Sequence, residues 1–147
     1  MALLLDEGAV TEHTDFKGRS AVYIAAAHGH VQTISLLHEH SEGALDTRDH
    51  GGQTPLHAAA GNGHAQCCLF LLQNGSSIHA GDDKGRTALH CAAYAGHTLC
   101  GITIIRMGGS ADMLDKQERT AVTAAVSAGH RECARSMEEE ARRVVTE

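Results

Sequence analysis

The chain has 147 residues, a formal net charge of −6, and an aromatic content of only 3% with no Trp. The negative charge argues against general attraction to nucleic acid or to an anionic membrane surface, and no run of 18 apolar residues predicts a membrane span. The apolar stretch 1–5 is followed at once by two acidic residues, so it is too short for a secretion signal.

One pattern recurs along the chain at spacings of 34, 33 and 33 residues, and each copy ends on a Gly-His pair. The copies occupy residues 20–30, 54–64, 87–97 and 120–130. The fullest copy reads TPLHAAAGNGH. A fixed period near 33 residues with a T-P-L-H-x-A core indicates a solenoid of stacked helical units.

The second copy shows why such a unit folds as helix-turn-helix. Residues 49–52 have the composition of a turn, Thr54 fits the N-cap of a first helix, and Pro55 fits its first position. Gly63 is placed to end that helix in the left-handed conformation. A second helix is predicted at about residues 65–73.

The later copies depart from this pattern in two ways. In the third, the second helix contains Gly101 and several β-branched residues, which disfavour helix, so we expect packing to hold it. In the fourth, Glu118 replaces a turn glycine and Thr123 replaces the histidine. Its last helix carries Glu–Arg pairs at i,i+4, and a polar outer helix is typical of a terminal repeat.

These motifs resemble the ankyrin repeat over nearly the whole chain. The resemblance implies an all-α solenoid of stacked helix-turn-helix units with β-turn fingers, forming a single domain over residues 1–147. The expected boundaries are a half repeat at 1–14 and full repeats at about 15–48, 49–81, 82–114 and 115–147. Residues 2–9 match only the second helix of a unit, so we favour a segment cut from a longer array over a chain that begins on half a repeat.

Twelve histidines and five cysteines raise the alternative of a metal-dependent or thiol enzyme. The resemblance assigns structural roles to His57, His90 and the four Gly-His histidines. His90 and Cys91 are neighbours on a helix and point about 100° apart, which is unsuitable for a catalytic pair. We therefore expect no catalytic residue, no cofactor and no metal. Cysteines without paired spacing favour a reducing cytoplasmic or nuclear setting.

The resemblance implies that the protein binds a partner protein on a concave face built from finger tips and first helices. The turn positions are expected to carry no structural duty. Six of the 12 basic residues of the chain lie on the tips, which favours an acidic partner segment over nucleic acid or a membrane. A structural spacer within a longer array is the alternative. The candidate contacts are Phe16, Lys17, Arg19, His28, His50, Gln53, Asn62, Lys84, Arg86, Tyr94, Lys116, Gln117 and Arg119.

Overall fold

The computed structural model describes residues 21–40 and 48–146, and this part of the chain contains eight helices and no strand. The predicted half repeat at 1–14 and the first finger lie outside the described residues. The helices are α2 (Ala21–Ala27), α3 (Val31–His40), α4 (Pro55–Gly61), α5 (Ala65–Gln73), α6 (Ala88–Ala95), α7 (Thr98–Arg106), α8 (Ala121–Ser127) and α9 (Arg131–Thr146).

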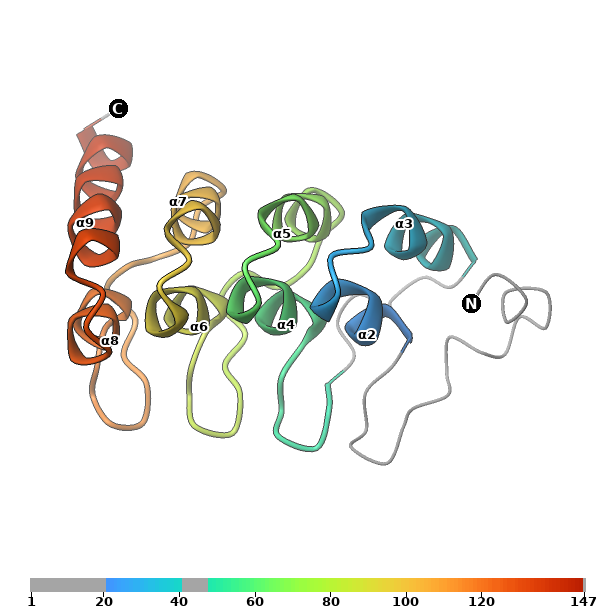
Figure 1. Cartoon of the computed structure of the whole chain (residues 1–147), viewed down its shortest axis with the longest axis horizontal. Coiled ribbons are helices and arrows are strands. Elements are labelled where there is room, and N and C mark those ends of the chain that lie inside the picture. The colour runs from blue at the N-terminus through green and yellow to red at the C-terminus, as the bar shows by residue number, and fades with distance from the viewer. Residues whose placement is uncertain (1–20, 41–47, 147) are drawn as a thin grey trace.

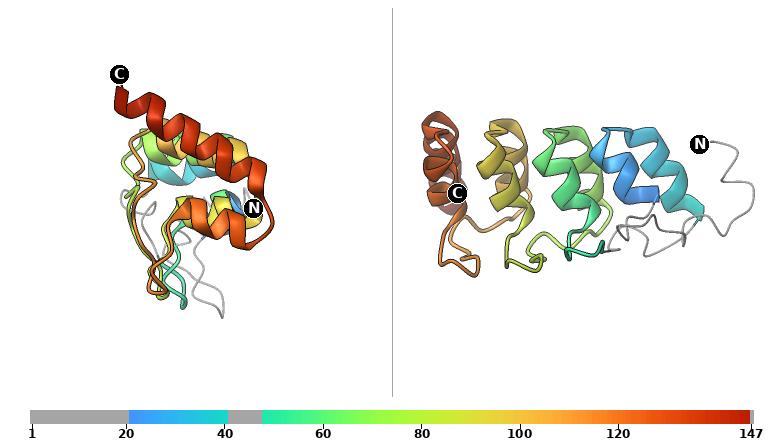
Figure 2. Two further views of the ribbon diagram at one scale, coloured as in Figure 1. Left: turned by 90° about the vertical axis from the view of Figure 1, so that its left-hand side faces the viewer. Right: turned by 60° about the horizontal axis from the view of Figure 1, so that its bottom comes forward.

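The helices form two layers, which confirms the all-α solenoid. The first helices of the units (α2, α4, α6, α8) make one layer, and the second helices (α3, α5, α7, α9) make the other. Between successive units the chain descends into a long finger that projects beyond the first helices (Figure 1). Viewed along the stack, the fingers superimpose and turn away from both helix layers (Figure 2).

Local sequence sets where the helices begin and end. The Thr54 side chain accepts a hydrogen bond from the backbone N–H of His57 and caps α4, with Pro55 at the first helical position, as predicted. Gly63 has φ +82, and a Cβ there would lie 3.0 Å from the ring of His97. Gly29 and Gly96 make the same contact with His64 and His130, so in these units the glycine leaves room for the histidine of the next unit.

The core is built from equivalent positions in successive units. Ala59, Ala60, Ala92 and Ala93 are fully buried, and such small side chains let the first helices pack closely. The second helices contribute one buried side chain at the same position of every unit. These residues are Leu37, Leu71, Ile104 and Met137.

Helix α7 forms despite its poor intrinsic propensity. Ile104 and Ile105 are buried in the core, and a Cβ at Gly101 would lie 2.7 Å from the sulfur of Met137 in α9. The glycine that weakens the helix is thus the residue that lets α9 approach, and tertiary packing outweighs propensity here.

The fourth unit differs where earlier units contact the next finger. Gly52 and Gly85 adopt φ +80 and +74, and a Cβ at Gly85 would lie 2.9 Å from the backbone nitrogen of Lys116. Glu118 holds the same left-handed conformation at φ +60. No finger packs against Glu118 among the described residues, so its Cβ has room but still carries the strain of that conformation.

The best-matched repeats should carry most of the stability. Leu56→Ala or Leu89→Ala should lower the free energy of unfolding by about 2–5 kcal/mol, since both side chains are fully buried. Val122→Ala, at the equivalent but half-buried position, should cost only about 1 kcal/mol. Urea unfolding of the three variants tests the ranking, and equal losses would contradict it.

Glu118 and Gly85 make a matched pair for backbone strain. Glu118→Gly should raise the free energy of unfolding by about 1 kcal/mol by relieving the left-handed strain. Gly85→Ala should lower it by at least about 1 kcal/mol, because the same strain is joined by a clash with the next finger. A Glu118→Gly variant less stable than the parent, compared by thermal unfolding, would show that Glu118 makes compensating contacts.

Candidate functional site

Each described finger is a turn closed by its own aspartate. We name the fingers by that residue: the Asp49 finger (49–53), the Asp82 finger (82–86) and the Asp115 finger (115–119). The Oδ1 atom of Asp82 accepts hydrogen bonds from the backbone N–H groups of Lys84 and Arg86, both at 2.9 Å. Asp49 and Asp115 accept the equivalent pairs of bonds in their own fingers. The finger backbone is therefore fixed.

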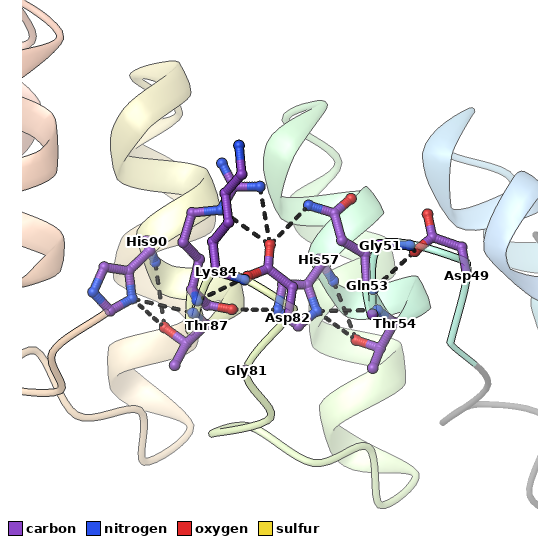
Figure 3. A network of polar contacts seen from close by, with 12 residues as sticks. Asp49, Gly51, Gln53, Thr54, His57, Gly81, Asp82, Lys84, Thr87 and His90 are labelled. Atoms are coloured by element: carbon purple, nitrogen blue, oxygen red, sulfur yellow. Dashed lines mark hydrogen bonds and ion pairs between the residues drawn. The ribbon is translucent and has the colours of Figure 1, made fainter. Parts of the chain in front are cut away.

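A buried histidine ties each of the helices α4 and α6 to the finger that follows it. The backbone N–H of Thr54 donates to Nδ1 of His57 (3.1 Å), so the ring proton lies on Nε2, which donates to the carbonyl oxygen of Arg86 (2.7 Å). His90 repeats this arrangement with Thr87 and with the carbonyl of Arg119 (2.8 Å). Figure 3 shows the two Thr–His pairs at corresponding places in consecutive units. The structural role that the resemblance implied for these two histidines is confirmed, and it consists of a bridge to the next finger.

The fingers are also joined directly to one another. The backbone N–H of Asp83 donates to the carbonyl of Gly51, and that of Lys116 donates to the carbonyl of Lys84, both at 3.0 Å. Arg48, for which no role was expected, donates to the carbonyl of Gly81 at 2.7 Å. The finger tips therefore form a connected strip.

The expectation that the turn positions carry no structural duty is wrong for three residues. Gln53 accepts from the Tyr23 hydroxyl (3.1 Å). Its amide also donates to Oδ2 of Asp82 (3.2 Å; Figure 3), so that Gln53 links three successive units. Arg86 pairs with Asp82 at 3.0 Å and Arg119 pairs with Asp115 at 3.2 Å. These side chains therefore support the fingers.

The two aspartates are held in their charged form. Burial would raise the pKa of Asp82, but the backbone N–H of Arg86, the amide of Gln53 and the Arg86 guanidinium together lower it. Asp115 follows the same pattern: burial opposes ionisation, and bonds from Arg119 and Gln117 lower its pKa. Each Asp–Arg pair is thus a neutral unit within its finger at physiological pH.

A hollow of about 450 Å³ lies between the Asp82 and Asp115 fingers beneath α6. Tyr94, the residue of α6 that reaches it, is 54% exposed. Lys84, Lys116 and Gln117 are exposed at its rim. Its lining is completed by the residues Asp83, Arg86, Asp115 and Arg119.

The structure brings together only part of the predicted contact set. Six of the candidates line the hollow: Lys84, Arg86, Tyr94, Lys116, Gln117 and Arg119. His50 is exposed on the Asp49 finger, while His28 bonds the carbonyl of Ile24 at the end of α2. Asn62 donates to the carbonyl of Ala58 and ends α4. Phe16, Lys17 and Arg19 lie outside the described residues.

The cysteines and histidines in the part of the chain that the structure describes form neither a metal cluster nor a disulfide. No group of three His, Cys, Asp or Glu residues there is arranged to hold a metal ion. All five cysteines are free thiols, and burial raises the pKa of Cys67 to about 11 and that of Cys91 to about 12. Both thiols therefore stay protonated at neutral pH, which opposes nucleophilic attack.

The bridge made by His57 predicts a loss of stability in mild acid. Burial lowers the pKa of His57 in the folded protein below its ordinary value of 6.5. Between these two pKa values the unfolded chain binds a proton at His57 and the folded chain does not. The stabilisation is complete above pH 6.5 and falls between 6.5 and the lower folded pKa, by at most about 1.4 kcal/mol per pH unit. Urea unfolding at pH 7.5, 6.5 and 5.5 should show a shallower pH dependence for His57→Gln than for the parent.

An NMR titration of the imidazole gives the direct check. A pKa for His57 above 6.5 in the folded protein would contradict the sign of this linkage.

The comparisons with known proteins agree with this architecture. The family model described as ankyrin repeats (3 copies) matches residues 1–82 and 74–142. Ankyrin repeat domain-containing protein 63 of Homo sapiens is 35% identical over 72 residues, which is 49% of this chain and 19% of that protein. Target of rapamycin complex 2 subunit AVO2 of Saccharomyces cerevisiae is 33% identical over 63 residues, 43% of this chain and 15% of that protein.

No helix among the described residues is long and apolar enough to cross a membrane. The repeat period, the two helix layers, the hydrogen-bonded fingers and a family match over nearly the whole sequence agree with one another. The chain belongs to the ankyrin repeat family.

Proposed function

We propose that this protein binds a partner protein on the face formed by its finger tips and first helices. The observation that carries the proposal is the hollow at Tyr94. There an exposed aromatic side chain and two exposed lysines meet on a surface whose backbone is already fixed by internal hydrogen bonds. A rigid surface loses little conformational freedom on binding, which favours affinity.

Three further observations support binding over catalysis. Ankyrin repeats generally mediate protein–protein interaction, and one relative is named as a subunit of target of rapamycin complex 2. The raised pKa values of Cys67 and Cys91 oppose a thiol enzyme. The free thiols also favour a cytoplasmic or nuclear setting for this binding function.

Tyr94 should be the energetic centre of the interface. Tyrosine is enriched among residues that dominate binding energy, and its ring presents a large area with few rotatable bonds. Tyr94 also stands where α4 has Gly61 and α8 has Ser127, so its ring rises above its neighbours in the layer of first helices.

The test is affinity capture with the full chain, identification of the partner by mass spectrometry, and measurement of the dissociation constant for two variants. Tyr94→Ala should weaken binding at least about tenfold. Leu99→Ala is the matched control, since Leu99 is 67% exposed but lies on α7 in the other layer. It should leave the dissociation constant unchanged.

Other results would identify a different role. Loss of affinity in Leu99→Ala with full affinity in Tyr94→Ala would move the interface to the second helices. A correctly folded chain that retains no protein would favour a structural spacer within a longer array.

A further inference from the structure

Four basic side chains line the hollow between the Asp82 and Asp115 fingers, but they are not equivalent. The guanidinium of Arg86 is paired with Asp82, and that of Arg119 with Asp115. Neither Lys84 nor Lys116 forms an ion pair with any other described residue, and both are exposed. The charge that a partner can use therefore comes from the lysines.

The exposed acid among the lining residues, Asp83, extends toward the Asp49 finger. Its Oδ1 atom would lie 2.6 Å from a Cβ on Gly52, so the carboxylate stands over the Asp49 finger. Lys116 holds the equivalent position in the next finger and leans in the same direction: its Cγ atom would lie 3.1 Å from a Cβ on Gly85, over the Asp82 finger. The carboxylate of Asp83 is therefore drawn toward the Asp49 finger, whereas Lys116 extends toward the finger that carries Lys84.

We propose that the hollow recognises an acidic side chain, Asp or Glu, in an exposed segment of the partner protein, with Lys84 and Lys116 binding the carboxylate and Tyr94 packing against a neighbouring apolar side chain. This inference rests on the proposed function and specifies the chemistry of its partner. A volume of about 450 Å³ lies within the range of small binding pockets.

A carboxylate fits better than a phosphorylated side chain. Specific phosphate recognition commonly uses the planar fork of an arginine, which donates two parallel hydrogen bonds. Both arginines at the hollow already use their guanidinium groups on Asp82 and Asp115. Two lysine ammonium groups provide positive charge without that fixed geometry, which is sufficient for a carboxylate.

The partner is unidentified, so the probe is a set of peptide pools. Each pool has one central residue fixed as Glu, phosphoserine, Lys or Leu, with random residues on either side. The immobilised full chain should retain the Glu pool about fivefold or more over the Lys pool at low salt, and the difference should shrink at high salt. Retention of both pools should fall in Tyr94→Ala.

The charge-reversal variant Lys84→Glu with Lys116→Glu should reverse the preference toward the Lys pool. Its matched control is Arg131→Glu with Arg135→Glu, which changes the net charge equally at exposed positions of α9. That control should keep the parent's preference for Glu. Circular dichroism checks the fold, and Lys84→Gln with Lys116→Gln replaces the reversal variant if it unfolds; the preference should then disappear.

Failure of this inference can be told apart from failure of the proposed function. Pools retained without charge preference, or with phosphoserine ahead of Glu, but lost in Tyr94→Ala would overturn the acidic partner and leave the binding face in place. A Glu preference that survives the lysine substitutions would also overturn it. Retention that is unaffected by Tyr94→Ala, or no retention of any pool, would overturn both.

Discussion

The buried imidazole that bridges neighbouring repeats is the contact on which the rest of the structure depends. His57 cannot satisfy both ring nitrogens within its own unit: Thr54 supplies a donor to Nδ1, but the acceptor for Nε2 is the Arg86 carbonyl, 29 residues further along the chain. An unpaired buried polar group is costly, so a unit is complete only when the next finger is in place. The same bond holds the finger of the next unit at a fixed distance from the first helices. That spacing gives the hollow its position.

The fourth unit lacks the buried histidine that needs an acceptor in a following finger, and two other positions of this unit differ as well. Thr123 stands in the place of the bridging histidine and bonds only to its own cap, Thr120. Glu118 replaces the glycine that would receive a following finger. Val126 is 48% exposed at the position where Ala60 and Ala93 are fully buried against the next helix. A further unit in the same register would meet a Cβ and a larger side chain there, so these residues suit a unit that ends the stack.

Much of the framework could be predicted because it depends on short-range chemistry. The cap at Thr54, the break at Gly63 and the helix at 65–73 follow from residues within one turn of each feature, and all three are confirmed. The bounds of the repeats, and the residues that contact a partner, stay predictions. The pairing of Arg86 with Asp82 was missed because both residues lie in a turn, where i,i+4 spacing carries no general rule. The hollow was missed because its existence depends on how two fingers and α6 pack together, which no local pattern encodes.

The basic residues of the fingers serve two different purposes. A count of charges on the finger tips suggests a strongly basic strip, yet in the Asp82 and Asp115 fingers the fixed aspartate neutralises the arginine four positions later. The arginine position therefore belongs to the framework, together with the histidine and the threonine. The first two positions after the aspartate are held by the turn through their backbone, so substitution there can change the surface charge without loosening the finger. In this protein Lys116 and Lys84 occupy the first and the second of these positions, and Tyr94 lines the same hollow. Stability and recognition are thus assigned to different residues of the same five-residue turn.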